Sequence, residues 1–77
     1  ESEVCLSDGR SDAVVHTKTH TFIFEFKLDE SPEIALQQII YKDYAQAFRH
    51  NNKEIIGIGI NFTTEKRNID GWVSQFL

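Results

Sequence analysis

An acid and a base stand two residues apart in an apolar segment, and a second acid precedes the segment before it. Glu25 and Lys27 lie within TFIFEFKL, residues 21–28, and Asp12 precedes AVVH. On a β-strand, residues i and i+2 project from one face about 6 to 7 Å apart. Burying an acid and an ammonium beside phenylalanines costs stability unless something compensates. The spacing therefore indicates a small polar site with a functional role.

These residue types predict a metal-dependent hydrolytic site. Asp12 begins the strand before that of Glu25, so a suitable hairpin register places the two carboxylates side by side. Two converging carboxylates form the oxygen cluster that Mg²⁺ prefers, and the carbonyl of Phe26 could add a ligand. The ion would acidify a water and polarise a phosphoryl oxygen, while Lys27 would orient that water and stabilise the developing charge. The chemistry expected is phosphodiester hydrolysis.

The elements that would position these residues follow from periodicity and turn signals. Short apolar runs predict strands over residues 2–6, 12–16 and 21–28, with a turn at 7–10 and a hairpin connection at 17–19. Residues 21–28 alternate, so Glu25 and Lys27 share one face and the phenylalanines share the other. A fourth strand is expected over 54–62, where β-branched and apolar residues are almost continuous, as in a central strand.

A helix is expected between the third and fourth strands. Ser31 suits the N-cap and Pro32 the first helical position. The apolar spacing continues to His50, and Asn51-Asn52 is a plausible stop. The order is then β-β-β-α-β, an α/β fold on a mixed sheet whose third and fourth strands run parallel. The tail, residues 69–77, has helical spacing interrupted by a glycine, and we expect an edge strand there.

Several short motifs resemble one family. They are GRSD, FEFK with its Glu thirteen residues after Asp12, LQQIIYKDY on the helix, and GIGINFTTEKRNIDGW near the end. Together they resemble the PD-(D/E)XK nuclease superfamily, and more narrowly the C-terminal nuclease-like domain of bacterial AAA-ATPase-like proteins. The resemblance implies that Asp12, Glu25 and Lys27 are catalytic. It also implies a Mg²⁺ or Mn²⁺ cofactor and an ATPase-like domain in the parent chain. The substrate implied is a nucleic acid, with DNA favoured over RNA.

The resemblance also covers the helix and shows two departures. It implies substrate binding by Gln38, Lys42 and Tyr44, while the related QxxxY pattern offers Gln37 with Tyr41. Ser11 stands where the family usually has proline before its first acid. The helix that normally precedes the first strand is missing from the sequence. The expected restriction-endonuclease-like core therefore leaves one sheet face uncovered, which predicts self-association.

Composition sets broad limits on class and location. The 77 residues suffice for a single domain, and 40% hydrophobic with 26% charged residues is an ordinary globular balance. The net charge of −4 argues against a generic nucleic-acid coat protein, although the carboxylates of a metal site contribute to it. One cysteine excludes an internal disulfide and, with no signal peptide visible, predicts a cytoplasmic protein. Starting at Glu1 without Met, the chain is expected to be a fragment of a longer protein.

Simpler interpretations remain open at each position. Glu25 and Lys27 suit a solvated strand face, and Asp12 suits a turn, although their joint occurrence favours a site. A competing function is a non-catalytic interaction or regulatory module attached to an ATPase-like domain. His16 and His20 flank the hairpin and could bind zinc. Lys42, Arg49 and Lys53 could contact phosphates or form a solvated helix face. Gly57 and Gly59 suggest that a helix approaches the fourth strand closely.

Overall fold

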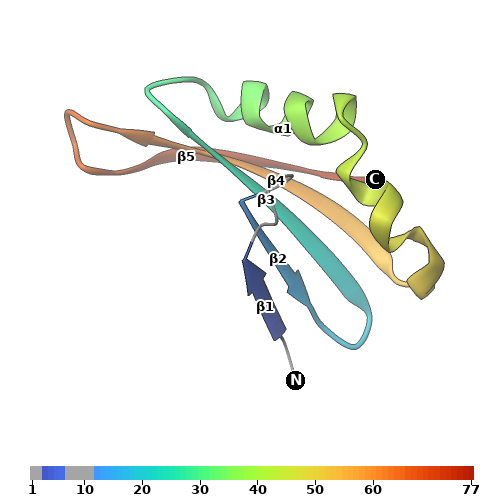
Figure 1. Ribbon diagram of the computed structural model, residues 1–77. Helices are drawn as coiled ribbons and strands as arrows, with labels where there is room; N and C mark the ends of the chain where they lie inside the picture. The colour runs from blue at the N-terminus through green and yellow to red at the C-terminus, as the bar shows by residue number, and fades with distance from the viewer. Residues whose placement is uncertain (1–2, 7–11) are drawn as a thin grey trace.

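A five-stranded mixed sheet carries its helices on one face (Figure 1). The computed structural model describes the backbone of residues 3–6 and 12–77 and the side chains of 12–77. The strands are neighbours in chain order: β1 (Glu3–Leu6), β2 (Ala13–His16), β3 (His20–Leu28), β4 (Glu54–Thr63) and β5 (Asn68–Phe76). β3 and β4 are parallel and the other pairs are antiparallel. The prediction of an α/β fold on a mixed sheet is confirmed, and the tail forms strand β5 as expected.

The predicted turn at residues 7–10 lies outside the described residues, as do Ser11 and the side chain of Cys5. The hairpin connection at residues 17–19 is confirmed, and the Thr17 amide donates to the His20 carbonyl at 2.8 Å across it. No helix within residues 12–77 is long and apolar enough to cross a membrane.

Two short helices follow β3, where the sequence predicted one helix over Pro32–His50. α1 spans Pro32–Tyr41, and a 3-10 helix, η1, spans Tyr44–Asn51. The single-helix prediction is wrong because Asp43 between them takes a left-handed conformation, with φ 51° and ψ 50°. Asp tolerates this conformation better than most residues. The resulting bend turns Tyr44 and Ala45 into the core, where they are 6% and 2% exposed.

The core lies between the helices and one face of the sheet. Its buried members come from β3, α1, η1 and β4: Ile23, Ile39, Tyr44, Ala45 and Ile55. On β3 this face also carries Thr21 and Glu25, and burial alternates along the strand as the sequence predicted. η1 ends at Asn51, followed by Asn52 with φ 56°, so the predicted Asn stop is confirmed.

Gly59 lets α1 lie close against the middle of the sheet. A Cβ added at Gly59 would lie 2.6 Å from the Leu36 amide nitrogen and 3.1 Å from the Ala35 Cβ. No side chain can occupy that space, so the predicted close helix approach is confirmed. Gly59 pairs with Glu25 across the parallel register. The helix backbone is therefore held close to the part of the sheet where Glu25 lies.

The opposite face of the sheet has no helix over it in the described part of the chain (Figure 1). We call this surface the open apolar face; its members are Phe22, Phe24, Phe26, Ile56, Ile58, Ile60, Phe62, Trp72 and Phe76. The rings of Phe24 and Phe26 stack with centroids 6.4 Å apart, and Phe62 lies 5.7 Å from Phe26. Trp72 and Phe76 are 65% and 66% exposed. The phenylalanines share one face of β3, as the alternation predicted, but the helices pack on the other face.

Candidate functional site

Asp12 lies beside Glu25 where β2 meets β3. Ala13 pairs with Phe24 in the antiparallel register, so the preceding residue, Asp12, stands opposite Glu25. The Asp12 amide donates to the Phe24 carbonyl at 3.1 Å, and the Phe26 amide donates to Asp12 Oδ2 at 2.7 Å. These two bonds hold Asp12 against β3 on either side of Glu25. The closeness expected from the sequence is therefore observed.

The backbone of Phe26 faces the same strand edge as Asp12. Within a strand, the N–H and C=O of one residue point to the same edge. Since the Phe26 amide donates to Asp12 Oδ2, its carbonyl is directed to the edge that Asp12 occupies. Three oxygen donors predicted from the sequence, two carboxylates and one carbonyl, thus come from one short stretch of neighbouring backbone.

Glu25 is the most unusual group in the site. Its side chain is 6% exposed, Oε2 accepts a hydrogen bond from Gln38 Nε2 at 2.8 Å, and Oε1 is buried with no partner among the described residues. Burial raises the pKa of Glu25 and the nearby Asp12 charge raises it further, while Lys27 and Lys42 partly oppose both effects. A buried acceptor left unpaired costs about 1 to 3 kcal/mol. The ionised carboxylate therefore has an unmet demand for positive charge.

Gln38 and Tyr44 form a bridge from the helices to that carboxylate. Gln38 Nε2 lies 2.8 Å from Glu25 Oε2 and 3.2 Å from the Tyr44 hydroxyl. Tyr44 is buried, because the bend at Asp43 turns it inward. The sequence predicted substrate contacts for both residues. In the structure, Gln38 donates a hydrogen bond to Glu25, and Tyr44 contacts Gln38.

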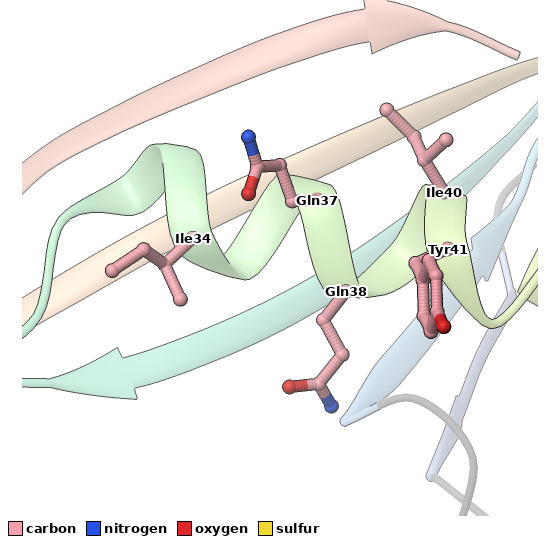
Figure 2. A pocket seen from close by; sticks show the side chains of 5 residues that line it. All are labelled: Ile34, Gln37, Gln38, Ile40 and Tyr41. Carbon is pink, nitrogen blue, oxygen red and sulfur yellow. The ribbon is translucent and has the colours of Figure 1, made fainter.

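Gln37 and Tyr41, the pair offered by the alternative QxxxY pattern, lie on the outer surface of α1. Figure 2 shows Gln38 and Tyr41 directed to one side of the helix and Gln37 to another. Tyr41 is 90% exposed and lines a shallow pocket with Ile34, Gln37, Gln38 and Ile40. The hydrogen bonds to Glu25 thus favour Gln38 over Gln37 as the site amide.

Two lysines place positive charge near Glu25. Lys27 follows it by two residues on the same face of β3 and is half-buried, and Lys42 is exposed beyond the end of α1. Both act on the pKa of Glu25. Neither forms an ion pair within residues 12–77. The acid and base of the E-x-K motif therefore share one surface, as the alternation predicted.

Asn61 is a site neighbour that the sequence analysis missed. It stands opposite Lys27 in the parallel register, is 6% exposed, and has a buried Oδ1 without a partner in the described part of the chain. The available signal was a polar residue inside the apolar run GIGINF, two positions after Gly59 and therefore on the same face. Its register position adds an amide beside the E-x-K motif.

The donor set fits a hard cation and does not fit zinc. Asp12, Glu25 and the Phe26 carbonyl offer oxygen atoms alone, which suits Mg²⁺ or Mn²⁺ completed by water and substrate oxygens. Within residues 12–77, no three His, Cys, Asp or Glu side chains form a metal-binding group. His16 lies across from Thr21 and contacts its hydroxyl at 3.1 Å, whereas His20 stacks on Phe22 of the open apolar face. The two histidines occupy opposite faces, so the zinc alternative is wrong.

Comparison with known proteins agrees with this geometry. A family model described as the PD-(D/E)XK nuclease superfamily matches residues 1–72. The chain belongs to this superfamily. A curated relative from Azotobacter chroococcum mcd 1, named as an uncharacterized protein in the vnfD 5' region, is 35% identical over 77 residues. That match covers 97% of this chain and 15% of the relative, so the chain spans a small part of the relative's length. No solved structure matches the chain.

Proposed function

We propose that this domain hydrolyses nucleic-acid phosphodiester bonds, with DNA as the favoured substrate over RNA. Mg²⁺ or Mn²⁺ would be held by Asp12, Glu25 and the Phe26 carbonyl. One observation carries the proposal. Glu25 is a buried carboxylate between Asp12 and Lys27, with one oxygen unpaired in the described residues, and the chain belongs to a nuclease superfamily. A bound cation would supply the positive charge that Oε1 demands and favour the ionised form.

The bound ion would supply Lewis acidity toward a water and a phosphoryl oxygen. The chain's own residues supply orientation and charge. The Phe26 amide fixes Asp12 Oδ2, and Gln38 fixes Glu25 Oε2, so both carboxylates are held before any ligand arrives. Lys27 extends from the same face as Glu25, where its ammonium would orient the attacking water and stabilise charge on the phosphoryl group. Held donors of this kind lower the reorganisation required during reaction.

The test is cleavage of single- and double-stranded substrates by the full-length protein, with and without divalent ions. Asp12→Asn, Glu25→Gln and Lys27→Met are each expected to reduce metal-dependent cleavage by about 10²-fold or more, because each removes charge at the reacting centre. Lys66→Met is the matched control, since Lys66 pairs with Asp70 in the β4–β5 hairpin. Retention of cleavage in all three site variants would refute the assignment.

A second candidate is a non-catalytic interaction or regulatory module joined to an ATPase-like domain. The observations favouring it are the 15% coverage of the longer relative and the open apolar face, which offers a docking surface. The two candidates differ in metal binding. A divalent ion that stabilises the wild-type domain but not Glu25→Gln supports the nuclease, whereas no stabilisation at millimolar metal, together with no cleavage, supports the module.

A further inference from the structure

Charge is sorted along the length of the sheet, although the whole chain carries −4. One end, where the β2–β3 hairpin meets the start of β4, carries three cations and one acid: Lys18, Arg49, Lys53 and Glu54. The opposite end, around the start of α1 and the β4–β5 hairpin, carries five acids and two bases: Asp29, Glu30, Glu33, Glu65, Asp70, Lys66 and Arg67. The net charge of the chain therefore does not describe either end.

The three cations line one pocket, which we call the basic pocket. Lys18 comes from the hairpin between β2 and β3, Arg49 from η1 and Lys53 from the turn into β4. The Glu54 amide donates to the Thr19 carbonyl at 3.1 Å and holds the hairpin and the turn together. Figure 1 shows these segments at the same end of the molecule. Residues distant in the sequence thus form one surface.

The basic pocket has a surplus of positive charge. Neither Lys18 nor Lys53 forms an ion pair within residues 12–77. Arg49 donates to Asp43 Oδ1 at 2.7 Å, which offsets most of its charge, and Glu54 is the acid among the lining residues. Two lysine side chains that line one polar hollow suit an anion with several oxygens. A phosphate group has this chemistry.

The pocket opens on the same side of the sheet as the candidate site. Ile55 lines the pocket and lies on the helix-covered face, next to Thr21 in the parallel register and four pairs before the Glu25–Gly59 pair. From His20 to Glu25, at about 3.3 Å per residue, the separation is about 17 Å. One strand of B-DNA advances about 3.4 Å along the helix axis per phosphate and also winds around that axis, so a straight span of this length reaches a few phosphates along the strand.

We infer that the basic pocket binds the phosphate backbone of the nucleic-acid substrate a few phosphates from the cleaved bond. This inference rests on the proposed nuclease function, because it takes its ligand from the substrate of that site. The contact is independent of sequence, since the lysine ammoniums bind phosphate oxygens, and phosphate contacts carry no sequence information. It explains how an acidic domain can bind a polyanion: Lys18 and Lys53 stand at one end of the sheet, away from the five acids at the opposite end.

The test measures binding of a labelled duplex and a labelled single strand to the full-length protein in EDTA, which prevents cleavage. The dissociation constant is followed against salt for wild type, for Lys18→Gln with Lys53→Gln, and for Lys66→Gln. Losing two phosphate contacts is expected to reduce the slope of log K against log salt by about 2 and to weaken binding roughly tenfold or more near 0.1 M salt. Lys66→Gln, at the opposite end of the sheet, should match wild type.

Each result decides the inference separately from the proposed function. An unchanged slope and affinity in the double variant overturns the inference, even if the Asp12, Glu25 and Lys27 variants lose cleavage. A reduced slope with no metal-dependent cleavage supports phosphate binding by the basic pocket and overturns the nuclease, together with the placement relative to a cleaved bond. Equal weakening by Lys66→Gln, or no binding by wild type, also overturns the inference. Circular dichroism and melting temperature confirm that the variants fold; Lys18 is exposed and Lys53 half-buried, so both should.

Discussion

Replacing Glu25 with glutamine is expected to stabilise the metal-free domain while removing the proposed metal-dependent cleavage. Wild type buries an ionised carboxylate whose Oε1 has no partner in the described residues, at a cost of about 1 to 3 kcal/mol. The amide oxygen of a glutamine can still accept the Gln38 hydrogen bond; its NH2 group takes the place of Oε1, and the buried charge and its repulsion with Asp12 disappear. We expect the free energy of unfolding to rise by about 1 to 2 kcal/mol at pH 8. In a domain of this size, each kcal/mol moves the melting temperature by roughly 4 to 8 °C.

The gain should depend on pH in a defined direction. Because the pKa of Glu25 is raised in the folded state, the folded protein binds this proton more tightly than the unfolded chain. The protonated carboxyl therefore favours folding fully below the unfolded pKa, and that contribution is lost as the pH rises through the folded pKa. Glu25→Gln should then exceed wild type most clearly near pH 8. Near pH 3, where wild-type Glu25 is protonated, the difference should shrink toward zero.

Divalent metal should reverse the order. An ion present at about 100 times its dissociation constant stabilises the domain that binds it by about 2.7 kcal/mol, more than the advantage of the variant. Wild type should gain this amount in Mg²⁺, and Glu25→Gln should gain little, because the substitution removes a charged ligand. The expected result is a variant more stable than wild type in EDTA and equal or less stable in Mg²⁺. This crossing links the buried charge to ligand binding.

Thermal and urea unfolding by circular dichroism, at both pH values and with and without Mg²⁺, measures these differences. Glu65→Gln is the control, because Glu65 is exposed in the β4–β5 hairpin and should change little under any condition. A loss of stability in metal-free Glu25→Gln near pH 8 would refute the reasoning, since it would show that the charge of Glu25 holds the fold together. Equal stabilisation of variant and wild type by Mg²⁺ would also refute it.

Two further predictions concern packing. Gly59→Ala should lower the free energy of unfolding by about 3 kcal/mol or more, because its Cβ would lie 2.6 Å from the Leu36 amide nitrogen. Gly71→Ala is the control and should cost under about 1 kcal/mol, because the nearest contact of its Cβ is at 3.4 Å. Urea midpoints measure both variants, and equal costs would contradict the packing argument. Trp72→Ser with Phe76→Ser should reduce concentration-dependent self-association in sedimentation runs, because it removes the most exposed rings of the open apolar face, and unchanged association would exclude that face.

The strand that carries the acid and base could be predicted from the sequence because the relevant rule is local. Side chains alternate with period two whatever the rest of the fold does, so Glu25 and Lys27 had to share a face. Predicting the position of Asp12 required the register of the hairpin as well, since a shift of one residue in the register would have moved Asp12 to the other face. The three-residue hairpin connection at 17–19 limited the choice of register, and the observed pairing places Asp12 opposite Glu25.

The break between α1 and η1 could not be predicted, because its cause is tertiary. Residues 32–50 carry helical spacing throughout, and Asp43 has no glycine or proline beside it to signal a turn. The left-handed Asp43 is maintained because it brings Tyr44 and Ala45 into the core and places the Tyr44 hydroxyl 3.2 Å from Gln38. Those gains depend on contacts with β3 and β4 that a local pattern does not contain. The face of the sheet that the helices cover could not be predicted either, because the phenylalanine face of β3 is the more apolar one and the helices pack on the other.

The glycine in β4 explains why packing and chemistry depend on one another here. Gly59 allows α1 to lie against the sheet, and that approach brings Gln38 within 2.8 Å of Glu25. The same approach removes water from Glu25, which raises its pKa and leaves Oε1 unpaired. A looser helix would hydrate the carboxylate and lose its fixed orientation. The domain therefore gains a held acid at the expense of stability, and a cation bound there would return that stability when the site is loaded.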